Sequence, residues 1–295
     1  MIGQPSGRRR SLTRIAAVYT VAIGAAAAWF FTGPSTRLWL DGLIADLIAT
    51  LVIFAASRVH HNSSMYDAYW SVLPPLLTIG WWIRSDTGVD DARGWCVLAV
   101  VCLWSVRLTG NWLTHFTGLH HEDWRYRLLR DRAGRAGGIV DLIGIHVVPT
   151  LQVFAGMLPV YVVVTRTERD VGWLDVIAVI VGLAAVTVSW VADRQLTVFA
   201  RAGAEGHTMD RGLWAWSRHP NYFGEFGFWF ALALFGLSAA PSTWWWVFLG
   251  AAGIYAMFAF ASIPMMEHRS LERRPEYAEV IARVPRFVPR PPRRS

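Results

Sequence analysis

The densest cluster of polar side chains is the nonapeptide SRHPNYFGE, which leads into an apolar run. Pro220 suits the first position of a helix. Asn221 and Glu225 are four residues apart, so they share one helix face. A helix N-terminus flanked by Arg218 and His219 is suited to binding an anion. A helix cap is the simpler interpretation, but a glutamate one turn inside an apolar run favours a ligand site.

A second polar segment is EDWRY at residues 122–126, which follows Arg107 and Asn111 at the end of an apolar run. Its residues Glu122, Asp123, Arg125 and Tyr126 would equally suit a solvated loop with ion pairs.

A third segment contains Tyr66, Asp67 and Tyr69 at the entrance to another apolar run. The charged form of a carboxyl is disfavoured there, so the group can stay protonated near neutral pH. A protonated carboxyl and a tyrosine can both donate a proton. The alternative interpretation is a helix cap within an aromatic belt.

Two further polar segments are DRQ at residues 193–195, with Arg201 beyond it, and EHR at 267–269. Each alone is typical of a charged flank beside a membrane. Asp41 and Asp175 are expected to be solvated near span ends. Asp46 and His146 lie deeper, facing a substrate cavity or each other.

The elements that must position these motifs are membrane helices. Hydrophobic residues make up 54% of the chain and charged residues 17%, whereas soluble domains carry about 25% charged residues. A span needs about 20 apolar residues. Eight runs are candidates: Ile15–Gly33, Leu38–Ala56, Tyr66–Ile83, Trp95–Leu113, Ile139–Thr165, Trp173–Val191, Phe223–Ala239 and Trp244–Ile263.

The distribution of arginine supports eight spans with both termini in the cytoplasm. This topology places 23 arginines inside and 5 outside, as the positive-inside rule requires. We therefore predict an all-α, polytopic transmembrane helical bundle of seven to eight spans, with cytoplasmic loops closing over a cofactor site. Residues 1–14 form a basic cytoplasmic N-terminus, 15–265 the membrane domain and 266–295 a cytoplasmic tail.

Several kinds of site are excluded by residue type. The basic residues are all arginine, so neither Schiff-base catalysis nor a P-loop lysine is available. No glycine-rich fingerprint follows a strand, which excludes a Rossmann domain. The histidine pairs at 60–61 and 120–121 cannot converge on one metal, so we expect no metal site. The net charge of +7 is explained by membrane topology, and we expect no nucleic-acid partner.

Together, these motifs resemble the bacterial branch of the steroid 5α-reductase family. The resemblance covers roughly Met65–Pro289 in matching order, through DAYWS at 67–71, EDWRY at 122–126, DRQ at 193–195 and SRHPNY at 217–222. It implies an NADPH-dependent membrane reductase that transfers a hydride to the C=C bond of an apolar conjugated enone, such as a steroid or another lipid. Such proteins usually have seven spans, so the first span here would be an extension.

The resemblance also implies residue roles. Asp67 approximately matches the family's catalytic glutamate, with Tyr66 and Tyr69 as alternative donors because an aspartate is shorter. Asp193, Arg201, Asn221 and Glu225 match cofactor-binding residues of the family. The full set that we predict to bind the cofactor is Arg107, Asn111, Glu122, Asp123, Arg125, Tyr126, Asp193, Arg201, Arg218, His219, Asn221, Tyr222, Glu225 and Glu267. Of these, Arg125, Arg201 and Arg218 are expected at phosphate, and Asn221 and Glu225 near the nicotinamide.

An alternative shares the C-terminal half. Isoprenylcysteine carboxyl methyltransferases, which use S-adenosylmethionine, show a similar arginine–histidine–proline turn and an arginine–phenylalanine–x–proline tail, here at residues 286–289. The amino-terminal motifs favour the reductase. We expect a protein of the bacterial cytoplasmic membrane whose apolar small-molecule substrate enters from the lipid. The sequence does not indicate an oligomeric state.

Overall fold

The computed structural model describes residues 5–33, 35–85, 92–166, 168–203 and 206–291, and these contain helices and no strands. The chain divides into two compact units, Met1–Thr167 (unit 1) and Glu168–Ser295 (unit 2). Residues 1–4 of the expected basic N-terminus and 292–295 of the expected tail lie outside the described residues.

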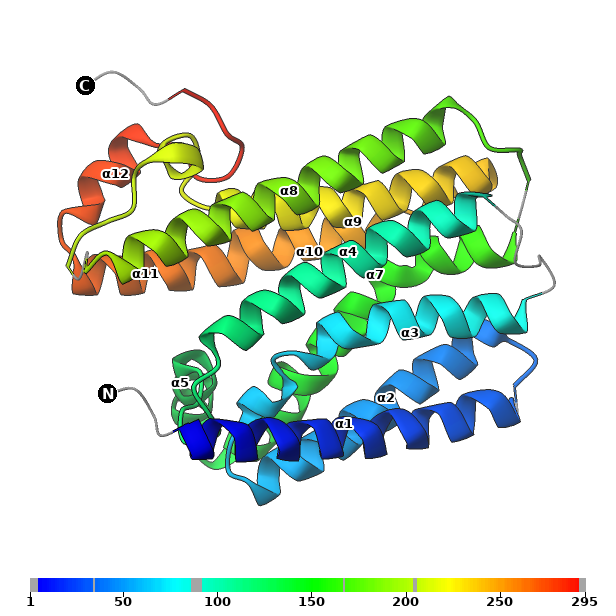
Figure 1. Ribbon diagram of the computed structural model, residues 1–295, viewed down its shortest axis with the longest axis horizontal. Coiled ribbons are helices and arrows are strands. Elements are labelled where there is room, and N and C mark those ends of the chain that lie inside the picture. Colours follow the sequence, from blue (N-terminus) through cyan, green and yellow to red (C-terminus); the bar gives the residue numbers. More distant parts are fainter. Residues whose placement is uncertain (1–4, 34, 86–91, 167, 204–205, 292–295) are drawn as a thin grey trace. The chain divides into compact units, whose positions relative to one another are not determined.

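The described residues of unit 1 form seven α-helices, and α1 lies along α2 (Figure 1). Its elements among the described residues are α1 (Pro5–Thr32), α2 (Leu38–Val59), the 3₁₀ turn η1 (Ser63–Tyr66), α3 (Tyr69–Arg84), α4 (Ala92–His115), α5 (Trp124–Ala133), the 3₁₀ turn η2 (Gly134–Ala136), α6 (Gly137–Val140), the π-helical η3 (Asp141–Val147) and α7 (Val148–Thr165).

Unit 2 is built on the close pair of α8 and α9 (Figure 1). Its described elements are α8 (Trp173–Arg201), η4 (Gly212–Ala215), α9 (Pro220–Ala239), η5 (Pro241–Thr243), α10 (Leu249–Met257), the π-helical η6 (Phe258–Ser262), α11 (Ile263–Arg273) and α12 (Tyr277–Arg283). A Cβ on Gly224 would lie 2.3 Å from Ser189 Oγ, so only glycine permits this approach of α9 to α8.

Seven helices in the described residues are long and apolar enough to cross a membrane. Of the eight predicted runs, the third is not among these seven helices, because its helix, α3, has only 16 residues. Such a helix is about 24 Å long, shorter than the roughly 30 Å hydrocarbon core. The fold class predicted from the sequence is confirmed.

Two π-helical segments widen long helices next to prolines. Residues 141–147 lead into Pro149 at the start of α7, and residues 258–262 lead into Pro264 at the start of α11. Proline cannot donate a backbone hydrogen bond, and a wider turn accommodates its ring without ending the helix. Both helices therefore continue past a residue that ordinarily stops them.

The prediction that Asp41 and Asp175 are solvated is wrong. Asp41 is fully buried, where its Oδ2 lies 3.1 Å from Arg84 Nη1. Asp175 accepts hydrogen bonds from Gly172 N and Ser238 Oγ, each at 2.8 Å. Both carboxylates lie in the first turn of their helices, where the helix dipole and local partners hold a negative charge without bulk water.

Candidate functional site

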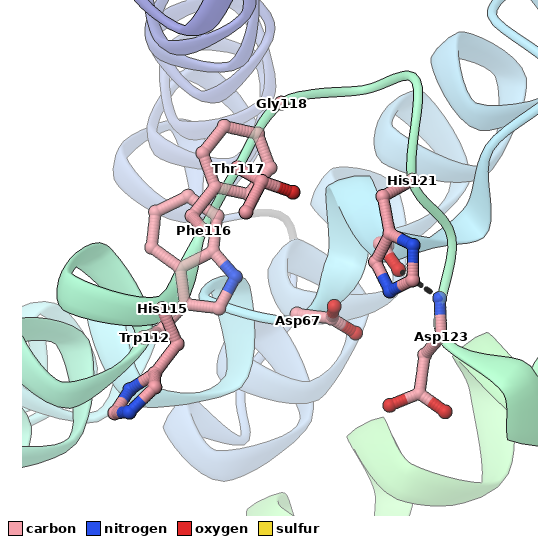
Figure 2. Close-up of a pocket in the computed structure, with 9 residues that line it drawn as sticks. Asp67, Trp112, His115, Phe116, Thr117, Gly118, His121 and Asp123 are labelled. Atoms are coloured by element: carbon pink, nitrogen blue, oxygen red, sulfur yellow. Dashed lines mark hydrogen bonds between the residues drawn. The ribbon is translucent and has the colours of Figure 1, made fainter. Parts of the chain in front are cut away.

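A pocket in unit 1 surrounds Asp67, directly after η1. The pocket has a volume of about 190 Å³. Figure 2 shows the Asp67 side chain between the Trp112–Thr117 segment on one side and His121 and Asp123 on the other. The lining residues are Ser64, Asp67, Trp112, His115, Phe116, Thr117, Gly118, His121 and Asp123.

Local hydrogen bonds hold Asp67 at this place. Asn62 caps η1 by accepting a hydrogen bond from Ser64 N at 2.9 Å, and Asp67 N donates to Ser64 O. The Tyr126 hydroxyl, from α5, donates to Asp67 Oδ1 at 2.5 Å. Burial raises the pKa of the Asp67 carboxyl to about 7, and the Tyr126 hydrogen bond partly offsets that effect. Asp67 is therefore an acid poised between its two protonation states at neutral pH.

The segment before α5 is fastened to η1 by its two acidic residues. Glu122 Oε1 accepts from Ser63 N at 2.8 Å, and Asp123 N donates to Ser64 Oγ at 3.0 Å. Asp123 also caps α5 by accepting from Arg125 N at 2.8 Å. Burial acts to raise the pKa of Asp123, but hydrogen bonds and charge from Arg125 lower it overall. These contacts bring Tyr126 to Asp67.

The remaining candidates in unit 1 are not part of this pocket. Tyr66 and Tyr69 are buried, and their hydroxyls bond to Thr150 Oγ1 at 2.7 Å and Asp46 Oδ1 at 2.9 Å. Among the described residues, the pocket lining includes neither Arg107 nor Asn111 of α4. The hydroxyl that donates to Asp67 Oδ1 is thus that of Tyr126, which was predicted to bind the cofactor.

The arginine Arg130 pairs with Glu122 and so braces the same region. Its Nη1 lies 3.0 Å from Glu122 Oε1, and its Nη2 donates to Oε2. Asp141, fully buried, accepts from Arg58 Nη1 at 2.7 Å and from Ser63 Oγ at 2.7 Å. Glu122 is therefore held in an internal ion pair.

A second cluster, in unit 2, is centred on Glu267 of α11. Its Oε1 accepts from Arg218 Nε at 2.7 Å and lies 3.1 Å from His219 Nε2. Arg218 Nη1 also donates to the carbonyls of Ile281 and Val284, at 3.0 and 2.8 Å. Arg218 was predicted to bind phosphate, but these hydrogen-bond donors already have partners within the protein.

The start of α9 is surrounded by polar and aromatic contacts. Asn221 Nδ2 donates to Asp193 Oδ1 of α8 at 3.2 Å. The Tyr222 ring stacks on Phe258, with centroids 4.6 Å apart, and on His219, at 5.7 Å. Five candidate residues, Asp193, His219, Asn221, Tyr222 and the buried Glu225, are therefore associated with the α8–α9 pair. Arg201 lies exposed in the last turn of α8.

The chain segment after α12 is fastened to the loop before α9. Arg218 N donates to Pro285 O, and Arg290 N donates to Trp216 O, each at 2.9 Å. Ser217 Oγ donates to Phe287 O at 2.8 Å. We call the region joined by these hydrogen bonds, residues 216–219 with 281–290, the tail clasp.

Burial raises the pKa of the Tyr277 hydroxyl in α12 to about 12, so this group stays neutral.

Most pocket residues that the sequence interpretation missed lie in the last turn of α4 and in the loop that follows it. Trp112 and Phe116 stack with ring centroids 4.7 Å apart, and Gly118 has a φ of +136°. Glycine adopts such a φ readily, so Gly118 was the one available signal of a shaped turn there. Among the described residues, no group of three or more histidine, cysteine or acidic side chains is placed to hold a metal ion.

Comparisons with known proteins identify relatives over most of the chain. A model of the family described as "Protein of unknown function (DUF1295)" matches residues 53–284. An uncharacterized protein of Schizosaccharomyces pombe is 25% identical, over 95% of this chain and 86% of the yeast protein. No solved structure matches this chain. The family match begins within α2 and ends just after α12, so it includes both polar clusters.

Proposed function

Because the chain belongs to the DUF1295 family, a membrane family related to steroid 5α-reductases, we propose that it is an NADPH-dependent membrane reductase. Its substrate would be an apolar conjugated enone, steroid-like or another lipid, whose C=C bond accepts a hydride. Both termini and the cofactor site would face the cytoplasm of a bacterial cell, with the short α3 as an eighth span that local thinning of the bilayer accommodates.

The observation that carries this proposal is Asp67, which lines the unit 1 pocket and accepts a hydrogen bond from the Tyr126 hydroxyl. In its protonated form Asp67, which accepts the Tyr126 hydroxyl on Oδ1 at 2.5 Å, can donate a hydrogen bond from its other oxygen to a ligand oxygen and stabilise the negative charge that develops there. A pKa of about 7 for Asp67 suits proton transfer at neutral pH. The stacked rings of Trp112 and Phe116 supply an apolar wall.

The pocket also limits which part of a ligand it can hold. A volume of about 190 Å³ is below the roughly 300–1,000 Å³ of ordinary ligand pockets. It suits the reacting end of a molecule rather than a whole dinucleotide. The remainder of either ligand would have to be held by other parts of the protein.

The residues of unit 2 fit part of a dinucleotide. The exposed Arg201 at the end of α8 suits a phosphate. The Asn221–Asp193 pair and the buried Glu225 offer the amide and carboxyl chemistry that a carboxamide recognises. We do not include Arg218 among the proposed dinucleotide-binding residues, because its guanidinium is hydrogen-bonded to Glu267 and to two backbone carbonyls. When bound, NADPH would supply the hydride. Asp67, held by the Tyr126 hydroxyl, would polarise the acceptor and supply its proton.

The test of the cofactor is thermal stabilisation of the purified protein by NADPH and, separately, by S-adenosylmethionine. We expect NADPH alone to raise the unfolding temperature. A rise with S-adenosylmethionine alone would overturn the reductase in favour of a methyltransferase, and no rise with either would favour a protein without a nucleotide cofactor.

The test of the acid pair is enone-dependent NADPH oxidation by Asp67→Asn and Tyr126→Phe proteins. We expect both to lose activity while retaining stabilisation by NADPH. Asp131→Asn is the matched control, because Asp131 is exposed on α5. Activity at the wild-type level in the Asp67→Asn protein would remove this residue from the site.

A further inference from the structure

Three fully or nearly fully buried aspartates of unit 1 differ in one respect. Asp41 is paired with Arg84, and Asp141 with Arg58, at 3.1 and 2.7 Å. Asp46, which is 1% exposed, receives only the Tyr69 hydroxyl on Oδ1, and its Oδ2 has no hydrogen-bond partner among the described residues. Asp46 is therefore the one of the three without a basic partner.

The surroundings of Asp46 contain neutral groups. Tyr69 of α3 bonds to it directly, and the ring of Tyr19, from α1, packs edge-on against Tyr69. Tyr66 of η1 also interacts electrostatically with Asp46. His146 of η3 bonds elsewhere, with its nitrogens 2.8 Å from Asp141 O and 3.4 Å from Ser57 Oγ. No described arginine neutralises Asp46.

An unpaired carboxylate inside a membrane bundle is strongly disfavoured relative to its protonated form. A protonated Asp46 keeps the hydrogen bond from Tyr69 on Oδ1 and carries its proton on Oδ2, the oxygen that has no described partner. A buried donor without an acceptor calls for an explanation such as a catalytic role or a bound water. We propose that Asp46 is a proton-binding site inside the membrane part of unit 1.

A row of buried hydroxyls connects this site to the other end of the helix. Thr50 interacts with Tyr69 and lies 2.8 Å from the Thr150 hydroxyl, which in turn lies 2.7 Å from Tyr66 Oη. Asp46 and Thr50 are four residues apart, so they lie on one face of α2. Hydroxyls both donate and accept hydrogen bonds, so this row can pass a proton without any group acquiring a lasting charge.

Beyond Tyr66, further contacts lead to the partly exposed end of unit 1. The Tyr66 ring lies 5.0 Å from the His146 ring, which reaches Ser57 and the Asp141 carbonyl. Asp141 is paired with Arg58, whose side chain is 47% exposed. The Tyr66–His146 contact is one between rings, so the hydrogen-bonded row that we assign as the route for the Asp46 proton runs from Tyr69 through Thr50 and Thr150 to Tyr66. Each hydroxyl accepts one proton on its oxygen as it gives up its own, so protons and charge balance.

The proton on Asp46 is tested by reaction with dicyclohexylcarbodiimide, an apolar reagent that modifies protonated carboxyls. We expect peptide mass spectrometry of the whole protein at neutral pH to find the adduct on Asp46. We also expect a protonated-carboxyl infrared band that Asp46→Asn removes and Asp41→Asn leaves, since Asp41 has an arginine partner. An unmodified Asp46, together with a band unchanged by Asp46→Asn, would overturn the proposal.

The route is tested by the rate at which that band shifts in deuterium oxide. Thr150→Val removes the hydroxyl between Thr50 and Tyr66, and we expect it to slow the shift several-fold while preserving the band. Thr78→Val is the control, because the buried Thr78 hydroxyl bonds only locally, to Pro74 O. Equal rates in the Thr150→Val and Thr78→Val proteins would refute the route. None of these measurements requires NADPH or an enone, so they stand apart from the proposed activity.

Discussion

The hydrogen bond between Tyr126 and Asp67 gives the sharpest quantitative prediction. Replacing Tyr126 by phenylalanine removes the hydroxyl that donates to Asp67 Oδ1 at 2.5 Å. This bond favours the ionised carboxyl, so its loss must raise the pKa of Asp67 above its present value of about 7. Without the Tyr126 hydrogen bond, less remains to oppose the effect of burial, which raises the pKa of Asp67.

The size of the shift follows from the strength of such a bond. A hydrogen bond to a charged group contributes about 1.5–3 kcal/mol, and one pKa unit corresponds to about 1.4 kcal/mol. Asp67 keeps some contact with the open pocket, so the lower end of the range applies. We therefore expect the pKa to rise by about one unit, to about 8. At pH 7 roughly nine-tenths of the variant's carboxyls would be protonated, against about half in the original protein.

The measurement is a carbon-13 NMR titration of aspartate side chains in detergent micelles, with Asp67→Asn used to assign the resonance. Tyr161→Phe serves as the control, because the Tyr161 ring packs on Trp81 rather than beside Asp67. A downward shift in the Tyr126→Phe protein, or the same shift in both phenylalanine variants, would refute the assignment of Tyr126 as the partner of Asp67.

Three further predictions concern stability and are measured by thermal unfolding in detergent. Asp123→Ala should cost about 1 kcal/mol through loss of the α5 cap. Because the folded pKa of Asp123 is lowered, its contribution is present above the unfolded pKa and is lost as pH falls, so variant and original should converge in acid. Gly224→Ala should cost about 1–3 kcal/mol by overpacking α8 against α9, whereas Gly24→Ala, with open space around it, should be neutral or stabilising. Glu267→Ala should cost about 3 kcal/mol because it leaves a buried arginine unpaired, while Glu272→Ala, in an exposed pair on the same helix, should cost less than about 1 kcal/mol. Equal losses within either pair of variants would contradict the packing or the burial that we describe.

Hydropathy and arginine placement predicted the helical membrane fold, because both depend on local composition. They overestimated the third span, since the run Tyr66–Ile83 is continuous in apolarity while the helix begins only at Tyr69. Hydropathy cannot show that the first residue of this run, Tyr66, belongs to the 3₁₀ turn η1 (Ser63–Tyr66) that precedes the helix.

The acid character of Asp67 was predictable from its position beside an apolar run, but its partner was not. Tyr126 lies 59 residues further along the chain, and no periodicity links the two. The same is true of Arg218, whose partner Glu267 is 49 residues away. A local pattern identifies a charged side chain and its helix face, whereas only the packed structure shows whether an opposite charge already satisfies it.

The tail clasp has a consequence for how the protein is made. The loop at residues 216–219 receives its partners from residues 281–290, which are synthesised about 70 residues later. When the ribosome delivers α8 and α9 to the membrane, the polar groups of this loop are still without those partners. Unit 2 therefore acquires its final arrangement only after α10 to α12 have been synthesised. Until then the polar groups of the loop must be hydrated by water. The loop residues Ser217, Arg218 and His219 are polar, so water can satisfy their hydrogen bonds during this stage of biogenesis.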